Sequence, residues 1–256
     1  MKRGMKKLFR LLIPIAALCV WGFTIPKAPF RIVFAGDSIT DGAWGGSNGT
    51  KRPSSQRNHH DLNHIYGHSY MMLCAARLSA DRPTEELYFY NRGISGNSLA
   101  DLELRWEEDI LSLHPDLISI LIGTNDVHYH LLHHAGEDFD YKEWERRYRK
   151  LLDEAQKENP NVMFIIGTPF VAKVGQIGEA ADYETRADMV KELDKIVEHI
   201  AADYHARLIR YDELFKSQSD KYPDVAPNHW IWDGIHPSPA GHQLMADEWL
   251  KVFYRL

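Results

Sequence analysis

The stretch FAGDSITDG, residues 34–42, places a serine hydroxyl directly after an apolar run and a Gly-Asp pair. Ser38 lies where a strand is expected to end and a helix to begin. One role for it is helix N-cap, which suits serine well. The other is a nucleophile on a tight turn, with helix amides nearby that favour an oxyanion. Taken alone, this stretch favours the cap.

The stretch WDGIHPSPAGH, residues 232–242, contains a base and a carboxylate that a nucleophilic serine would need. An imidazole must take the hydroxyl proton, and a carboxylate must orient that imidazole. Asp233 and His236 are three positions apart, so one loop could carry both. The alternative is a simple turn at a helix start, with the aspartate as cap. His242 is a competing base, but it falls inside the expected last helix and is expected to pack or cap there.

Two glycine-rich turns contain groups that could donate to an oxyanion. In NRGISGN, residues 91–97, the donor would be the backbone N–H of Gly96. In GTND, residues 123–126, it would be the side-chain amide of Asn125. Each turn also has an ordinary explanation, as a strand-to-helix connection or a cap. Asp126 is expected to orient its loop.

Five β-like runs alternate with helical patterns and should bring these turns together. The runs are RIVFAG (31–36), LYFYNRG (87–93), DLISILIG (116–123), VMFIIGT (162–168) and RLIRYD (207–212). Most are continuously apolar, as expected of parallel strands buried on both faces. The alternation predicts one doubly wound α/β/α domain. Three of the four polar stretches follow expected strands, at the carboxyl edge where open α/β sheets bind ligands.

Helices are expected between these runs. The patterns cover residues 66–80, 98–113, 139–159, 185–204 and 238–256, each with apolar residues at helical spacing. The segment at 41–64 is long, polar and rich in glycine, serine and asparagine, so it is expected to be a loop leaving the carboxyl edge of the first strand.

The order GDS, GxxGN, GxND and DxxH resembles the SGNH hydrolases, also called the GDSL esterase/lipase family. The resemblance spans about residues 30–250. It implies a flavodoxin-like three-layer α/β/α sandwich around a mainly five-stranded parallel sheet. It further implies a serine esterase that forms an acyl-enzyme and needs neither a metal nor an organic cofactor.

The resemblance also assigns roles to individual residues. It implies that Ser38 is the nucleophile, that His236 is the general base and then the general acid, and that Asp233 holds His236 in the useful tautomer. The oxyanion hole would consist of the backbone N–H groups of Ser38 and Gly96 and the side chain of Asn125.

Within the family, the segment 91–127 resembles a branch that includes acetylxylan esterases, and so do GTPF (167–170) and the 232–242 stretch. This resemblance implies a carbohydrate O-deacetylase acting on small or oligosaccharide esters. The 41–64 loop is longer and richer in histidine than that branch's pattern. A lipase, thioesterase or lysophospholipase stays open, because acyl specificity depends on the loops. A non-catalytic glycan-binding domain on the same fold is the remaining alternative.

Five residues are candidates for lining the substrate site: Asp37, Trp44, His128, Phe170 and Trp232. The two tryptophans could stack on sugar rings, but aromatic residues of this kind also pack in ordinary surfaces. The histidines of NHHDLNH, residues 58–64, lack a carboxylate or cysteine spacing that would make a convincing metal site. A solvated loop is the favoured interpretation there.

Composition and the first residues set the remaining expectations. The hydrophobic content of 44% and charged content of 26% are ordinary for a globular protein, and the net charge of −6 does not favour nucleic acid as a partner. Residues 1–28 combine a basic start with an apolar core, Leu11–Phe23, which predicts a secretory signal or an N-terminal anchor before a hydrolase domain at 29–256. Localisation outside the cytoplasm, secreted or periplasmic, follows from that prediction. Cys74 is then the single cysteine of the domain and is expected to be buried.

Overall fold

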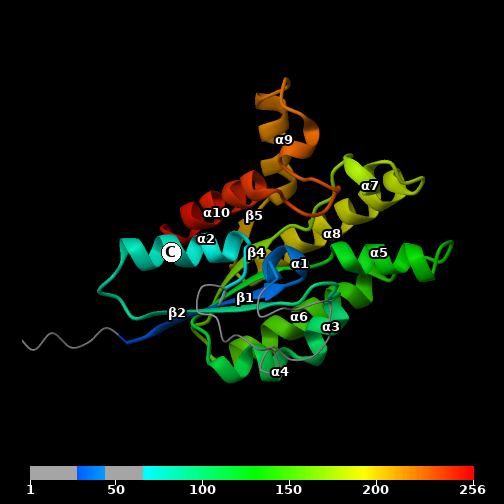
Figure 1. The fold of residues 1–256 in the computed structure, drawn as a ribbon. Coiled ribbons are helices and arrows are strands. Elements are labelled where there is room, and N and C mark those ends of the chain that lie inside the picture. The colour runs from blue at the N-terminus through cyan, green and yellow to red at the C-terminus, as the bar shows by residue number, and fades with distance from the viewer. Residues whose placement is uncertain (1–27, 44–65) are drawn as a thin grey trace, which may run out of the picture.

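The structure is a computed structural model that describes residues 28–43 and 66–256. Its sheet contains five parallel strands in the order β2-β1-β3-β4-β5 (Figure 1). The strands are β1 (Phe30–Gly36), β2 (Leu87–Gly93), β3 (Leu117–Leu121), β4 (Met163–Gly167) and β5 (Arg207–Ile209). This is the order of the flavodoxin-like doubly wound fold, so the predicted fold class is confirmed.

Helices cover both faces of the sheet, as parallel strands require. The helices are α1 (Ser38–Asp41), α2 (Tyr70–Asp81), α3 (Leu99–Leu104), α4 (Trp106–Asp109), α5 (Thr124–His133), α6 (Tyr141–Glu158), α7 (Gly175–Gly178), α8 (Tyr183–Asp203), α9 (Tyr211–Lys221) and α10 (Pro239–Phe253), with 3-10 turns at Leu111–Leu113 and Pro227–His229. Buried residues of α2, α9 and α10 pack on one face of the sheet, and those of α3, α4, α6 and α8 pack on the other.

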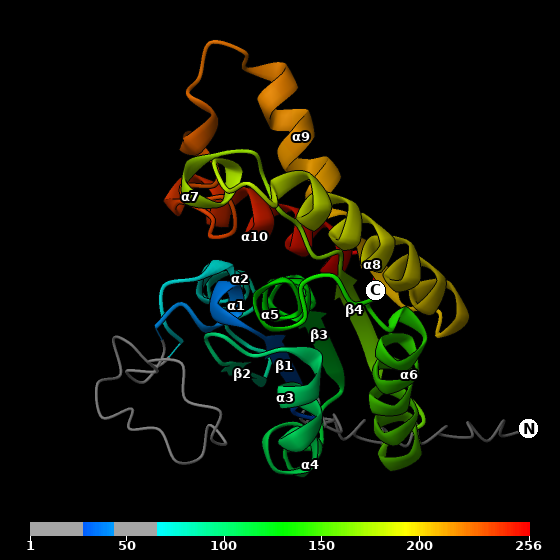
Figure 2. The same cartoon turned by 90° about the vertical axis from the view of Figure 1, so that its right-hand side faces the viewer.

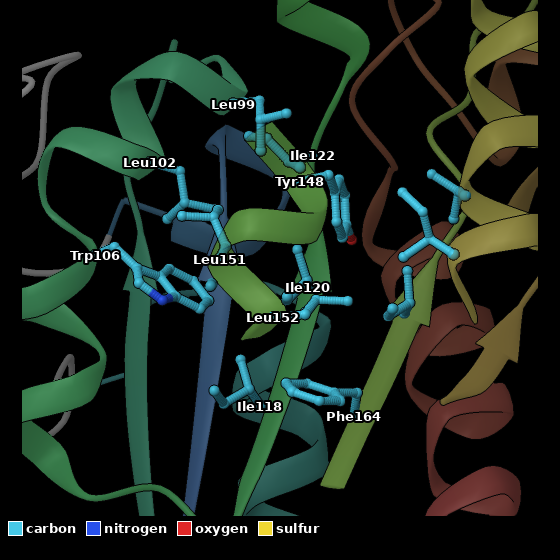
Figure 3. Close-up of a cluster of buried hydrophobic side chains, with 14 of the residues drawn as sticks. Leu99, Leu102, Trp106, Ile118, Ile120, Ile122, Tyr148, Leu151, Leu152 and Phe164 are labelled. Atoms are coloured by element: carbon cyan, nitrogen blue, oxygen red, sulfur yellow. The ribbon is translucent and has the colours of Figure 1, made fainter. Parts of the chain in front are cut away.

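Strand β1, which lies between β2 and β3, shows how the sequence builds these two layers. Ile32 and Phe34 face the layer of α2 and α10, whereas Val33 and Ala35 face the layer of α6 and α8. Because all four are fully buried, the run reads as continuously apolar. Figure 3 shows part of the core on the face covered by α3, α4, α6 and α8, where Ile118 and Ile120 of β3 lie against leucines of α3 and α6. Burying each such side chain contributes about 1.5–3 kcal/mol.

The helix expected over residues 98–113 is not continuous. It is divided into α3, α4 and a 3-10 turn, and the first break falls at Arg105, whose φ of −117° and ψ of 8° lie outside the helical region. The side chain of Arg105 is buried and bonded to groups outside its own helix. The apolar periodicity was correctly placed, but it did not indicate this interruption.

The expected strand at 207–212 is also shorter than its apolar pattern suggested. β5 ends at Ile209, and Tyr211 already begins α9. The backbone N–H of Tyr211 donates to the hydroxyl of Thr168, and that hydroxyl donates to Asp212. These bonds take the place of the backbone hydrogen bonds to β4 that a longer β5 would have made. α5 and α9 were not expected at all, because polar residues dominate both segments.

Among residues 28–43 and 66–256, no helix combines the length and apolarity that crossing a bilayer would require. The thiol of Cys74 is free and fully buried, as expected, between α2 and α10.

Asp194 of α8 is a buried carboxyl without a full set of partners. Only 7% of the residue is exposed, and its Oδ1 makes no hydrogen bond within the described residues. Burial raises the pKa of Asp194 to about 8, and the nearby Asp212 carboxylate adds to this shift while Arg210 opposes it. The folded protein therefore holds a proton there that the unfolded chain releases near pH 4.

This proton predicts a specific pH dependence of stability. The pKa of Asp194 is higher in the folded than in the unfolded protein. Its contribution to the free energy of unfolding is therefore fully present below about pH 4 and is lost as the pH rises towards 8. Asp194→Asn should therefore raise the free energy of unfolding at pH 9 by on the order of 1–3 kcal/mol and change it little at pH 4. Urea unfolding at both pH values measures this. The exposed Asp188→Asn on the same helix is the control, and an equal effect of Asp194→Asn at both pH values would contradict the prediction.

Candidate active site

The nucleophile candidate lies on the turn where β1 ends. Ser38 is the first residue of α1, and the N-cap is Asp37, whose Oδ1 accepts the backbone N–H of Ile39 at 3.0 Å. The cap that the 34–42 stretch, taken alone, favoured for Ser38 is therefore supplied by Asp37, one position earlier. Because aspartate takes over the capping, the serine hydroxyl is free to point away from the helix. Figure 2 views the edge of the sheet at which α1 and α5 begin.

The loop between Ile231 and Pro237 brings the imidazole to this serine. His236 Nε2 lies 2.8 Å from Ser38 Oγ, and His236 Nδ1 lies 2.6 Å from Asp233 Oδ2. Both distances are within hydrogen-bonding range. The three residues form the continuous Ser-His-Asp chain of a serine hydrolase, assembled from segments at opposite ends of the domain.

Backbone bonds fix the orientation of this loop. The other carboxylate oxygen of Asp233 accepts the backbone N–H groups of Ile235 and His236 at 2.9 and 2.7 Å. An isolated bridge between Ile231 and Pro237 closes the base of the loop. Gly234 adopts a φ of +103°, and a Cβ there would come within 2.6 Å of the Ile177 side chain. Glycine is needed at this position for both reasons.

The charges of the loop suit a general base. The hydrogen bond with the Asp233 carboxylate raises the pKa of His236 above its ordinary value, although partial burial opposes the shift. Burial acts to raise the pKa of Asp233, but hydrogen bonds from the ring and backbone of His236 and from Ile235 outweigh it and hold that pKa below its ordinary value. The pair is therefore a carboxylate that stabilises an imidazolium as it forms.

The predicted oxyanion donors lie on loops that hydrogen bonds connect to the serine turn and to one another. Gly96 has a φ of +78°, a conformation open to glycine, and its carbonyl accepts the Tyr129 hydroxyl at 2.9 Å. The side-chain amide of Asn125 donates one N–H to the carbonyl of Asn97 at 3.0 Å and keeps a second N–H. Within the described residues, the backbone N–H groups of Ser38 and Gly96 donate to no protein acceptor. These groups form a candidate oxyanion hole.

Asp126 holds the two donor loops together. Its carboxylate accepts the backbone N–H of Leu99 at 3.1 Å through each oxygen. Burial raises the pKa of Asp126 to about 7, and the N–H of Leu99 opposes the shift. The expectation that Asp126 orients its loop agrees with these contacts.

Asn91 and Asp41 also fix the site, and sequence reasoning gave neither a role. The buried amide of Asn91 donates to the carbonyls of Thr40, Asp41 and Tyr66, while its oxygen accepts the N–H of Gly93. The Asp41 carboxylate accepts the N–H of Ser95 at 2.8 Å. The available signal was a polar residue inside an apolar strand run at position 91, since such a residue needs buried partners.

Two of the expected substrate-lining residues have other roles. Asp37 is 2% exposed and caps α1, and burial raises its pKa to about 6. Phe170 is also 2% exposed, and its ring packs against those of Phe215 and Tyr211 with centroids 4.9 and 6.3 Å apart. Phe170 is therefore part of the core, since an apolar ring following β4 is buried by α9.

The remaining described candidates stay accessible. Trp232 is 59% exposed, and its ring is roughly parallel to that of His236, with centroids 6.2 Å apart. His128 lies one turn after Asn125 on α5 and is half-buried. Its Nδ1 lies 3.2 Å from the guanidinium of the buried Arg186. Because a guanidinium can only donate, Nδ1 is the acceptor and carries no proton, so the ring is neutral. Burial lowers the pKa of His128, and Arg186 adds to that effect.

His242, the competing base, is engaged elsewhere. Its Nδ1 accepts the backbone N–H of Tyr70 at 3.2 Å, and burial lowers its pKa to about 4, with His236 acting in the same direction. It therefore packs within the protein, as expected from its place in α10. Trp44 and residues 58–64 lie outside the described residues. Across the ranges 28–43 and 66–256, no three His, Cys, Asp or Glu side chains are grouped as metal ligands.

Comparisons with known proteins agree with this geometry. Residues 34–244 match the model of the GDSL-like Lipase/Acylhydrolase family. The chain belongs to this family. The family match extends from the strand before Ser38 to the helix after His236, so it includes both halves of the candidate triad. The protein is thus a GDSL esterase, and the family and fold that the sequence indicated are confirmed.

Individual relatives cover nearly the whole chain. An acetylxylan esterase from Geobacillus stearothermophilus is 29% identical over 223 residues, which are 86% of this chain and 92% of that protein. The solved structure of a GDSL-like lipase from Parabacteroides merdae superposes with a TM-score of 0.72 at 29% identity, covering 89% of this chain and 96% of the other. A catalytic histidine mutant of Axe2, an acetylxylan esterase from G. stearothermophilus, gives a TM-score of 0.68 at 28% identity, covering 89% and 94%.

The electrostatics predict how this GDSL esterase responds to pH. Only the neutral imidazole accepts the serine proton, so kcat/KM should rise with pH through the pKa of His236, with a midpoint above 6.5. Asp233→Asn removes the charge that raises this pKa. It should therefore shift the midpoint to lower pH and lower kcat severalfold or more. Profiles of kcat/KM on p-nitrophenyl acetate measure both effects.

His242→Asn is the matched control for this experiment. The asparagine oxygen can accept the N–H of Tyr70 in place of Nδ1, so the variant should keep the wild-type midpoint. A midpoint that moves in His242→Asn and stays fixed in Asp233→Asn would show that the wrong histidine had been assigned as the base.

Proposed function

We propose that this GDSL esterase removes acetyl groups from carbohydrates through an acyl-enzyme on Ser38. The observation that carries the proposal is the similarity to an acetylxylan esterase over 86% of this chain and 92% of that enzyme. The Ser38–His236–Asp233 hydrogen bonds support the chemistry. A short acyl group and a sugar leaving group together define the proposed substrate class.

The proposed reaction has two halves. His236 takes the hydroxyl proton as Ser38 Oγ attacks the acetyl carbonyl, and the negative oxygen is stabilised by the N–H groups of Ser38 and Gly96 and the amide of Asn125. His236 then gives the proton to the departing sugar oxygen, which leaves acetyl on Ser38. In the second half His236 takes a proton from a water molecule that attacks the acyl carbonyl, and it returns that proton to Ser38 Oγ as the Oγ–acyl bond breaks and the acetyl group leaves as acetic acid, which ionises to acetate.

Trp232 supports a carbohydrate at the leaving-group side. Its exposed ring lies beside His236, the residue that protonates the departing oxygen. An aromatic face can pack against the apolar face of a sugar ring, and a single exposed tryptophan next to a catalytic base has no role in the core. We propose that this ring contacts the sugar carrying the ester.

A long-chain acyl hydrolase is the second candidate, favoured by the similarity to a GDSL-like lipase. The same triad would serve it, so the choice depends on acyl length rather than on mechanism. A non-catalytic glycan-binding protein is disfavoured, because the triad hydrogen bonds are intact.

Acyl-chain preference tests the proposal directly. The purified protein should hydrolyse p-nitrophenyl acetate with a kcat/KM at least about tenfold above that for p-nitrophenyl octanoate, since a site shaped for acetyl gains little from further methylenes. It should also release acetate from one or more members of a panel of acetylated oligosaccharides. Acetate release, measured by coupled assay, identifies the glycan.

Ser38→Ala is the control in both assays and should be inactive while remaining folded. A preference for octanoate together with no acetate release from any glycan would favour the lipase candidate. Full turnover by a folded Ser38→Ala protein would overturn the serine mechanism altogether.

We also propose that the enzyme acts outside the cytoplasm. The support is the basic start and apolar core of residues 1–28, nearly all of which lie outside the described residues. Expression of the full chain with a C-terminal tag in a bacterial host should place the protein in the periplasm, the medium or the membrane fraction. Replacing Leu12 and Ile15 by aspartate should keep it in the cytoplasm, and an unchanged distribution would contradict the proposal.

A further inference from the structure

Arg105 is a buried cation that the reaction described above does not use. It is 2% exposed and lies at the break between α3 and α4. Its guanidinium makes three directed bonds: Nε to Asn97 Oδ1 at 2.8 Å, Nη1 to Asp109 Oδ2 at 2.8 Å, and Nη2 to the carbonyl of Gly36 at 3.3 Å. A single side chain therefore joins the end of β1, the loop after β2 and α4.

The two groups that Arg105 bonds outside its own helices, Gly36 and Asn97, are each close in sequence to a candidate oxyanion donor. Gly36 is two residues before Ser38 on the serine turn. Asn97 follows Gly96 directly, and its carbonyl accepts the side-chain amide of Asn125 at 3.0 Å. The three donors come from three separate segments of the chain, and Arg105 bonds two of those segments directly and the third through Asn97.

The cost of burying the group argues for a geometric role. Burial lowers the pKa of Arg105, which means that the surroundings disfavour its charge, and Asp109 offsets that effect. Asp109 alone could neutralise the cation, and buried ion pairs often add little net stability. The bonds to Asn97 and Gly36 use the flat, fixed fork of the guanidinium, which holds two partners at a set spacing in a way that an ammonium cannot.

We propose that Arg105 is the positioning residue of the oxyanion hole, setting the spacing of the Ser38, Gly96 and Asn125 donors through Gly36 and Asn97. The inference rests on the proposed esterase mechanism but not on the acetyl or carbohydrate specificity. Arg105 touches no reacting atom and acts only through the groups that do.

Arg105→Lys tests the proposal, because it keeps a positive charge beside Asp109 and removes the fork. On p-nitrophenyl acetate, kcat should fall about 10–100-fold, at or below the roughly 100–1,000-fold loss typical of removing one oxyanion donor, because the donors are displaced rather than removed. KM should change less than about threefold. Combined with Asn125→Ala, the loss should be clearly smaller than the product of the two single losses, because both changes damage the same donor set.

Asn97 variants keep the test decisive if Arg105→Lys folds poorly. Asn97→Leu removes the acceptor of Nε and leaves the Arg105–Asp109 pair in place, so it should also lower kcat. Asn97→Asp keeps an oxygen at the same position and should restore most of the activity that Asn97→Leu loses. Leu78→Ala, in the buried core of α2, is the stability control and should lower Tm without lowering kcat.

Three results would overturn the proposal. They are an unchanged kcat in folded Arg105→Lys, independent effects of Arg105→Lys and Asn125→Ala, and an equal kcat loss in Leu78→Ala at matched loss of Tm. The esterase mechanism is judged separately by Ser38→Ala, since an active wild type and an inactive Ser38→Ala would stand whatever Arg105 does.

Discussion

The hydrogen bond between Ser38 and His236 joins residues 198 positions apart, and the rest of the architecture serves to bring those two atoms within 2.8 Å. The serine turn is fixed because β1 is the second strand of the sheet, paired with β2 on one side and β3 on the other. The histidine loop is fixed by α7 and the chain before it: Ala172 donates to the carbonyl of Gly234, and Ile177 donates to that of Asp233. The two halves of the triad thus meet as parts of rigid neighbours.

The ionisable groups around this hydrogen bond differ in burial, and the more buried ones fix turns whereas the more exposed His236 is placed to transfer a proton. His242 is held neutral by its surroundings, and the carboxyls of Asp37 and Asp126 have pKa values raised to about 6 and 7. Each of these groups accepts a backbone N–H, so each one fixes a turn. His236 is more exposed than they are, and it has the raised pKa of an imidazole paired with a carboxylate. A neighbourhood rich in acids and histidines therefore contains one imidazole placed for proton transfer.

The groups proposed for chemistry and the group proposed for sugar contact differ in exposure. The donors and the triad are fastened by buried bonds, through Arg105, Asn91 and Asp126, whereas Trp232 projects from the site into solvent. One fold can serve different substrates when the loops around a common site differ. The proposed carbohydrate specificity consequently depends on few groups.

The sequence by itself determined the parallel sheet and placed the serine turn and the two glycine turns at its carboxyl edge, and the Asp-x-x-His loop just before the last helix. Apolar runs and their order are local properties, and the topology of a doubly wound sheet follows from them. Only the tertiary structure decided that Asp37 rather than Ser38 caps α1, that Phe170 is buried, and that Arg105 interrupts a helix to bond Gly36 and Asn97. These outcomes depend on which distant groups meet. Arg105 and Asp109 are four positions apart in the segment expected to form one helix, a spacing that allows an ion pair but does not indicate the distant groups that Arg105 also meets.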